Sequence, residues 1–459
     1  MKPIIKNILI VGVLSALTAC KVTQPYQAPR LNSAGLFRGD TSADTNSIAK
    51  LHWEQVFTDT ILQGLIKQGI QHNIDLQKAY SVTRQAQAYL DQSKLAFYPS
   101  VNADAGLSLA GVANPRNLAT QTKSHVYTSE LTASWEADIW GKLKSAKKAQ
   151  LASMLQSTAN ARAVQTVLIA DIANNYYNLM ALDRQLAITE QSVKNWQTTV
   201  NTMKSLKASD VVTGAAVVQS EASKYAVQGT IPDLKQSIWQ TENTINLLLG
   251  LPPGPVKRSR LDVQQPLTML NTGVPAQMLA NRPDVMAAEY SFRNTFELTN
   301  VARTYFYPSL TLTGSGGYSS YSSFFGVGSL IGNLTAGLAQ PIFNQGVNKT
   351  RLRVAKEQQQ QALLNFQYTV LSAGQDVSNA MMSYQTAGEK AVSRVSELEN
   401  LEKSVNYTQQ LVRYGSANYT EVLTAEQSYL TAQLNSVNDH LQQLQAVVYL
   451  YRSLGGGWE

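Results

Sequence analysis

The sequence predicts a mainly α-helical fold with a smaller β part, built as two copies of one unit. The tetrapeptide Phe-Tyr-Pro-Ser occurs at 97–100 and again at 306–309. Both copies are followed by residues that alternate between apolar and polar, which is the period of a β-strand. Each alternating region then leads into a long stretch without proline, as expected for long helices. The order of these features is the same in both copies, so we interpret them as an internal tandem repeat.

The first 20 residues, MKPIIKNILIVGVLSALTAC, predict a secretory signal. Lys2 and Lys6 make its start basic, and the apolar run that follows is too short for a membrane-spanning helix. The end, Leu-Thr-Ala-Cys, resembles the bacterial lipobox, in which the cysteine is lipidated and becomes the new N-terminus. Cys20 is therefore the predicted lipidation site, and Lys21 after it favours the outer membrane by resemblance to lipoprotein sorting rules. An ordinary signal peptide with a stray cysteine is the alternative.

Two β-hairpins are predicted, one in each copy, because apolar and polar residues alternate in 101–109, 127–139, 310–313 and 330–340. Strands of about ten residues with one apolar face are used by membrane β-barrels. Four strands cannot close such a barrel, and lipid does not tolerate open sheet edges. Copies of the chain would have to combine, giving eight strands in a dimer or twelve in a trimer. The polar face, with Asp104, Glu130 and Glu136, would then line the lumen; a soluble sheet with one wet face is the alternative.

Each hairpin leads into a long helix followed by a turn and a second helix. Residues 142–213 contain neither glycine nor proline, and residues 348–414 contain no proline. In 430–451 apolar residues are spaced alternately by four and three, which is the seam of a coiled coil. Residues 227–248 follow the same spacing, with Thr241 in one of the positions. Pro232 interrupts the earlier helix and is expected to kink or break it. Both copies end at Leu-Gly, at 249–250 and 454–455.

Composition argues against several classes of function. Charged residues make up 15% of the chain, and the net charge of +7 is spread along it without a basic tract beside aromatic residues. Nucleic-acid binding is therefore not expected. The four histidines lack metal-ligand spacing, and no nucleophile arrangement or phosphate-binding loop is present, so no catalytic residue, metal or cofactor is predicted. Arg282 and Asp284 could form a catalytic pair, but Pro283 between them more simply begins a helix.

Motifs along nearly the whole chain resemble one family. The stretch NRPDVMAAE at 281–289, followed by VAR at 301–303 and FYPSLTLTG, resembles the RPDV-x-AAE…AR…FPSLSLTG pattern of outer-membrane efflux factors. LLGLPPG at 248–254 resembles LLG-x-PPG of that family, and Trp53 and Phe57 match its N-terminal motif. These proteins are OprM-like lipoprotein channels of the TolC superfamily that serve resistance-nodulation-division (RND) pumps.

The resemblance implies a homotrimer in the outer membrane of a Gram-negative bacterium. Each chain would give four strands to a twelve-stranded transmembrane β-barrel, and its coiled-coil helices would form a periplasmic α-barrel with a mixed equatorial belt. An inner-membrane RND transporter would pass drugs or other small toxic molecules through a periplasmic adaptor protein into this passive duct. The chain would be no enzyme and need no cofactor beyond its lipid. Two other functions stay open: the exit duct of a type I secretion system and a structural coiled-coil lipoprotein.

The resemblance also implies a gate at the turn between the two helices of the second pair. The family often has acidic residues at the positions of Glu421 and Thr424; only the first is acidic here, so any carboxylate ring would be single. Arg413 and Tyr414 lie where the family uses interhelical locking contacts. The alternative for Glu421 is a solvated carboxylate at a helix N-terminus. The two turns would dock the adaptor through Asp210, Val211, Val212, Thr213, Gly214, Gly415 and Ser416.

These observations predict a division of the chain into consecutive segments. They are the signal peptide 1–19, a lipidated tail 20–50, first-repeat N-terminal helices 51–98, the first transmembrane hairpin 99–140, the first helix pair 141–252, an equatorial linker 253–281, a second-repeat helix 282–306, the second transmembrane hairpin 307–343 and the second helix pair 344–459.

Overall fold

The structure is a computed structural model that describes residues 22–29, 36, 48, 51–113, 121–266, 281–324, 328–414, 416 and 418–458. The predicted signal peptide, Cys20 and Gly415 lie outside these residues. The chain forms two compact units, each described by itself below. One comprises residues 1–30, 82–158 and 287–367, and the other comprises 31–81, 159–286 and 368–459.

The element order confirms the internal duplication. After the short helices α2 (Trp53–Val56) and α3 (Thr60–His72), the first copy contains α4 (Ile74–Leu95), β1 (Ser100–Ala113), β2 (Gln121–Ala137), α5 (Lys142–Ala208) and α6 (Gly214–Leu248). After η2 (Leu261–Val263), the second copy contains α8 (Pro283–Thr304), β3 (Ser309–Ser320), β4 (Ser329–Ala339), α9 (Val347–Arg413) and α10 (Tyr419–Ser453). Corresponding helices have equal lengths: 22 residues for α4 and α8, 67 for α5 and α9, and 35 for α6 and α10. The bounds of α5 and α6 become those of α9 and α10 when 205 is added (142 to 347, 248 to 453).

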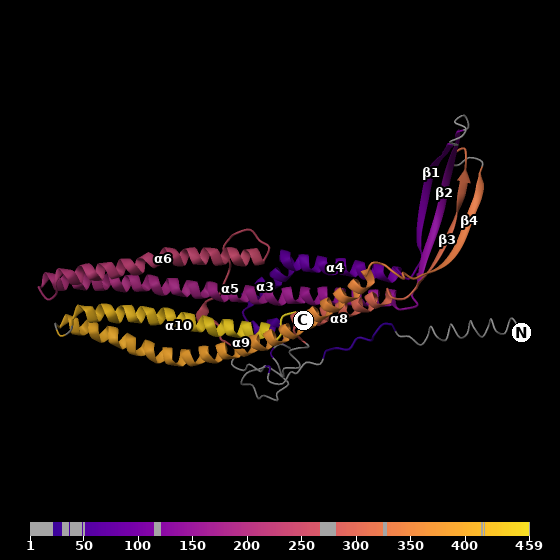
Figure 1. The fold of residues 1–459 in the computed structure, drawn as a ribbon. Coiled ribbons are helices and arrows are strands. Elements are labelled where there is room, and N and C mark those ends of the chain that lie inside the picture. Colours follow the sequence, from indigo (N-terminus) through magenta and orange to yellow (C-terminus); the bar gives the residue numbers. More distant parts are fainter. Residues whose placement is uncertain are drawn as a thin grey trace. The chain divides into compact units, whose positions relative to one another are not determined.

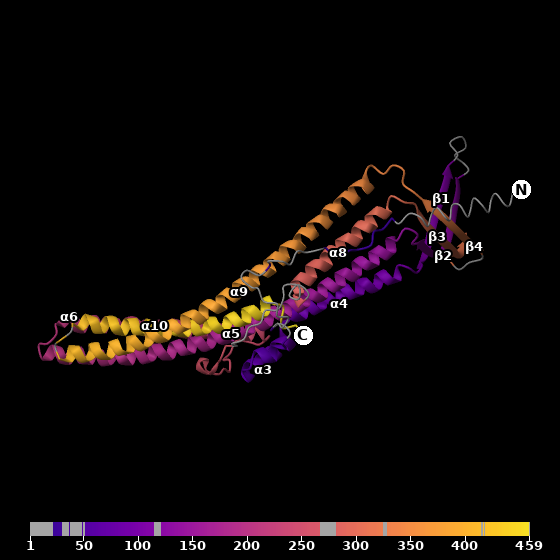
Figure 2. The same ribbon diagram turned by 90° about the horizontal axis from the view of Figure 1, so that it is seen from below.

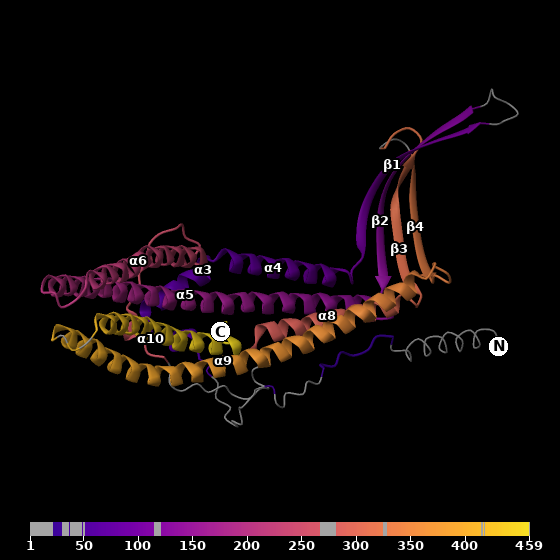
Figure 3. The ribbon, with the colours of Figure 1, turned by 60° about the vertical axis from the view of Figure 1, so that its left-hand side comes forward.

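The sheet of the first unit has the order β1-β2-β3-β4, with every neighbouring pair antiparallel (Figure 3). Among the described strands, β1 and β4 each have a neighbour on one side only. The predicted alternation of faces is present, since Ala103 pairs with Leu131 while the next residue, Asp104, pairs with Glu130. In the single chain the apolar face is uncovered: the exposed fraction is 67% for Leu109 and 88% for Leu330.

Each Phe-Tyr-Pro-Ser motif is the joint between a helix and a strand. The indole N–H of Trp135 donates to the backbone oxygen of Phe97 at 2.9 Å. In the second copy, the indole N–H of Trp140 donates to the backbone oxygen of Pro308 at 2.7 Å. These bonds tie β2 and the residues after it to the chain where it leaves a helix and enters the sheet.

The N-terminal tail is fixed along α8 of the same unit. The backbone of Gln24 and the side-chain amide of Asn300 exchange hydrogen bonds of 3.0 and 2.9 Å. The Tyr26 ring packs against Phe292 and Phe296. Residues that follow Cys20 by only a few positions are therefore held against the folded unit.

The second unit is a bundle of long helices, in which α6 runs beside α5 and α10 beside α9 (Figures 1 and 2). The predicted seam of α10 is buried at Leu430, Val437, Leu444, Val448 and Tyr451. In the part of the chain that the structure describes, no helix is both long enough and apolar enough to cross a membrane.

Pro232 does not break α6, contrary to one of the two outcomes expected, because α6 continues on both sides of it. Proline leaves the carbonyl four residues earlier, on Gln228, without its helical donor. Gln228 and Pro232 are both exposed, so water can replace the lost hydrogen bond.

Candidate functional site

The two turns at the end of the helical bundle share one backbone hydrogen bond at equivalent positions. Beyond α5, the N–H of Val211 donates to the oxygen of Leu206 at 2.9 Å and that of Asp210 to Lys207 at 3.0 Å, which is a Schellman motif. Beyond α9, the N–H of Ser416 donates to the oxygen of Leu411 at 2.9 Å. Asp210 has a left-handed φ of 57° at the position that Gly415 occupies in the second copy. The predicted docking residues thus lie on two matching turns.

A small apolar cluster joins the four long helices just behind these turns. It consists of Met203, Ala216, Val217, Val412 and Val422, all buried, with Leu206, Val212 and Tyr419 packed against it. Of the predicted docking residues, Val212 therefore belongs to this cluster, whereas Val211 is 48% exposed. Thr213 is the N-cap of α6 without a side-chain cap bond, and Gly214 is the first residue of that helix.

The predicted gate residues Glu421 and Thr424 are exposed and lie three positions apart at the start of α10. At this spacing they share one face of the helix. The opposite face of α10 is buried at Val422, Leu423 and Ala425. This packing holds Glu421 and Thr424 on the exposed side of the helix. Glu421 is in the first turn, where the helix dipole favours a negative charge.

Arg413 and Tyr414 end α9 at the same turn. Tyr414 is 83% exposed, and Arg413 lines a small cavity of 30 Å³ together with Thr199 of α5 and Val422 of α10. In the described residues the Arg413 guanidinium forms no ion pair. The structure thus brings Arg413 to the junction of α5, α9 and α10, and its predicted locking contact stays a prediction.

Glu426 is a buried acidic residue near the turns that sequence reasoning did not single out. It lies on α10 and is 7% exposed. Its Oε1 atom accepts hydrogen bonds from Thr199 Oγ1 of α5 at 2.5 Å and from Gln409 Nε2 of α9 at 2.9 Å, while Oε2 is buried without a hydrogen-bond partner among the described residues. Burial raises the pKa of Glu426, and the two hydrogen bonds act in the opposite direction.

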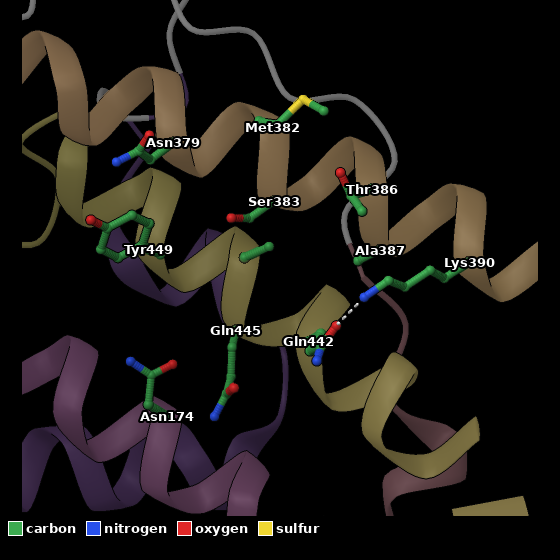
Figure 4. Close-up of a pocket in the computed structure, with 11 residues that line it drawn as sticks. Asn174, Asn379, Met382, Ser383, Thr386, Ala387, Lys390, Gln442, Gln445 and Tyr449 are labelled. Atoms are coloured by element: carbon green, nitrogen blue, oxygen red, sulfur yellow. Dashed lines mark hydrogen bonds between the residues drawn. The ribbon is translucent and has the colours of Figure 1, made fainter. Parts of the chain in front are cut away.

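A groove of 690 Å³ lies between α9 and α10 farther from the turns (Figure 4). Asn379, Ser383 and Thr386 of α9 and Gln445 of α10 are among the residues that line it, and Lys390 donates to Gln442 at 3.5 Å. Within the described part of the chain, no group of three or more His, Cys, Asp or Glu side chains could hold a metal ion. This groove presents amides and hydroxyls, without the acid–base pair that catalysis would need.

The predicted lumen residues of the sheet fall into two environments. Asp104 and Glu130 lie directly opposite each other on β1 and β2, on one face of the sheet. Glu136 near the end of β2 forms an ion pair with Lys142 at 2.9 Å. Two of the three carboxylates thus form an acidic pair, and the third is matched by a cation at the helix joint.

Comparisons with known proteins cover nearly the whole chain. The profile of the family described as outer membrane efflux protein matches residues 65–251 and 274–456, one segment in each copy of the repeat. Cation efflux system protein CusC of Escherichia coli O6:H1 is 27% identical over 460 residues, covering 97% of this chain and 98% of CusC. The pyoverdine export outer membrane protein OpmQ of Pseudomonas putida is 28% identical over 466 residues, covering 99% and 98%. The open-state crystal structure of the MtrE outer membrane channel of Neisseria gonorrhoeae matches with a TM-score of 0.85 at 26% identity, covering 96% of this chain and 99% of MtrE.

Proposed function

The chain belongs to the outer membrane efflux protein family, and on this premise we propose that it forms the trimeric exit duct of a tripartite RND-type efflux pump. It is an outer-membrane efflux channel protein with the TolC-superfamily fold, and its family consists of passive ducts that need no cofactor. Export would be driven by an inner-membrane RND transporter and delivered through a periplasmic adaptor.

The observation that carries the proposal is the incomplete sheet. One chain provides four strands with an uncovered apolar face and, among the described strands, two outer strands with one neighbour each. Lipid can cover the apolar face, but it cannot satisfy the backbone groups of an open edge. Three chains would close twelve strands, whereas a soluble coiled-coil lipoprotein would have to cover both the edges and the face in another way.

The proposed cargo is a small toxic molecule such as a drug. One relative is named for cation efflux and another for pyoverdine export, although this chain matches both along almost their full lengths. Such different cargoes in one fold support selection by the inner-membrane partner instead of the duct. A type I protein secretion duct is the second candidate, and a gene for an ABC exporter beside that of this chain would favour it over an RND partner.

We place the gate at the periplasmic turn of α9 and α10, with Glu421 at the constriction and Arg413 and Tyr414 in contacts that hold the helices closed. The exposed Glu421, fixed by the buried residues around it, supports this assignment. Three Glu421 carboxylates at a constriction would repel one another and attract cations. Asp210, Val211, Thr213, Gly214 and the second turn would receive the adaptor, and Cys20 would carry the lipid anchor.

The proposal is tested with the full-length lipoprotein purified in detergent and reconstituted in planar bilayers. We expect a detergent-resistant trimer that forms pores of low conductance, mostly closed. Arg413→Ala combined with Glu421→Gln should raise the open fraction severalfold, because both the proposed lock and the carboxylate ring are changed. Lys403→Ala, at an exposed position farther along α9, is the control. A monomer without pores contradicts the duct, whereas pores unaffected by the double change contradict only the gate.

A further inference from the structure

A second cavity, of 440 Å³, lies between α5, α9 and α10 on the other side of the Thr199–Glu426–Gln409 hydrogen bonds from the small Arg413 cavity. Trp196 of α5, Glu402 and Gln409 of α9, and Glu426 and Tyr429 of α10 are among the residues that line it. Its size is that of a small-molecule site. All of these residues belong to one compact unit of the chain.

The charged side chains that line this cavity are all acidic. Two of its lining residues are acidic, and none of the described residues that line it is lysine or arginine. Glu426 is more than nine-tenths buried, and its Oε2 atom has no hydrogen-bond partner within the described chain. A buried carboxylate is costly unless a cation or further donors compensate its charge. The fold therefore retains a buried acid whose charge has no counterpart in the cavity wall.

The first copy of the repeat contains the same acid with its cation. Glu221 of α6 forms an ion pair of 2.7 Å with Lys204 of α5. Adding 205 to these numbers gives Glu426 and Gln409. The second copy thus keeps the glutamate but has a neutral glutamine, which donates a hydrogen bond, where the first copy has the lysine.

We propose that the cavity binds one small organic cation with a primary ammonium group, whose charge is compensated by Glu426. Glu402 at the exposed side of the cavity adds a second negative charge, and Trp196 and Tyr429 provide aromatic walls. An ammonium group is stabilised both by a carboxylate and by aromatic ring faces. A bare metal ion prefers several oxygen ligands and gains little from aromatic walls. The site does not rest on the proposed duct, because binding needs only this unit of the chain.

The site also implies a pH dependence of affinity. Glu426 must be ionised to compensate an ammonium charge, and burial raises its pKa. Lowering the pH through this raised pKa protonates Glu426 and weakens binding, while an alkylammonium keeps its charge. The other titratable groups around Glu426 are Glu402 and Tyr429 in the cavity and Arg413 in the neighbouring one. Glu402 is exposed and should therefore contribute less than Glu426.

Isothermal titration calorimetry of the full-length protein in detergent tests the proposal, with phenethylammonium as the probe and neutral 2-phenylethanol as its matched control. We expect saturable binding of phenethylammonium alone, weakening as the pH is lowered from 8 to 5. Gln409→Lys places a lysine beside Glu426, as Lys204 lies beside Glu221 in the first copy. This lysine would compensate the charge of Glu426 itself, so the affinity for phenethylammonium should fall at least tenfold. Glu426→Gln should have the same effect. Glu221→Gln, the identical change in the first copy, should have no effect.

Equal binding of phenethylammonium and 2-phenylethanol would overturn the cation site, as would unchanged affinity in Gln409→Lys. Competition by Mg²⁺ at equal concentration would assign the cavity to a metal ion instead. Glu426→Gln could perturb packing, but Gln409→Lys retains Glu426 and reproduces a pair that the fold already accommodates in the first copy. The elution volume and the thermal transition of the purified protein, measured for each variant, separate loss of the site from loss of the fold.

Discussion

At the scale of single residues, the backbone angle of Asp210 determines the shape of the turn between α5 and α6. Its φ of 57° lies in the left-handed region, which aspartate tolerates and which β-branched residues avoid. We expect Asp210→Val to destabilise the turn by about 1–2 kcal/mol and Asp210→Gly to be neutral or stabilising. Thermal unfolding of the purified protein measures both. Thr213→Ala is the control, because Thr213 makes no side-chain cap bond; an Asp210→Val variant as stable as the parent would contradict the assigned turn.

The residue scale is also where sequence reasoning missed most. Nothing in the local sequence distinguishes Glu426 from Glu221, the equivalent residue of the first copy. The burial of Glu426 depends on Thr199, more than 200 residues away in the sequence, and on Gln409 of another helix. Comparing aligned positions of the two copies, Lys204 against Gln409, is the one signal that could have found it.

At the scale of elements, the ends of α6 and α10 are fixed by glycines. Gly250 has a φ of 69°, and a Cβ added to it would lie 2.7 Å from the backbone oxygen of His72 at the end of α3. Gly455 has a φ of 88°, and its Cβ would lie 2.8 Å from the backbone of Asn281. The predicted Leu-Gly sequences thus end the two helices, and they also lie at sites where another part of the backbone approaches closely.

Gly250→Ala should therefore lower stability by more than 1 kcal/mol, because strain and a backbone collision act together. Gly229→Ala, inside α6, is the matched control: nothing lies within 4 Å of its added Cβ, and alanine there should stabilise α6 by about 0.5–1 kcal/mol. Chemical denaturation followed by circular dichroism compares the two. Equal effects of the two changes would show that the end of α6 is not seated on α3.

Element types could be predicted well because their signals are local, although β1 and β2, with 14 and 17 residues, are longer than the strands of about ten that were expected. The stretch without glycine or proline from Lys142 gave α5, and strict alternation gave the hairpins. The break expected at Pro232 was the weak point. The carbonyl of Gln228 loses its helical donor there, but it lies on an exposed face of α6 where water can replace that donor. Pairing of β2 with β3 joins the two hairpins, and this depends on long-range packing that no local pattern encodes.

At the scale of the whole molecule, assembly depends on what covers the apolar face of the sheet. Leu334 of β4 is 75% exposed and lies on the apolar face, while its neighbour Thr335 lies on the opposite face. If three chains form a barrel, the first side chain faces lipid and the second faces the lumen.

Leu334→Arg should then prevent assembly in the outer membrane, because an arginine on the lipid face near the midplane costs about 2–4 kcal/mol and a trimer carries three of them. Thr335→Arg introduces the same charge on the polar face and should leave assembly intact while changing ion selectivity. Membrane fractionation and the heat-sensitive trimer band on gels measure assembly, and bilayer recordings measure selectivity. If both variants assembled equally, lipid could not be the solvent of that face, and the sheet would have to be covered by protein.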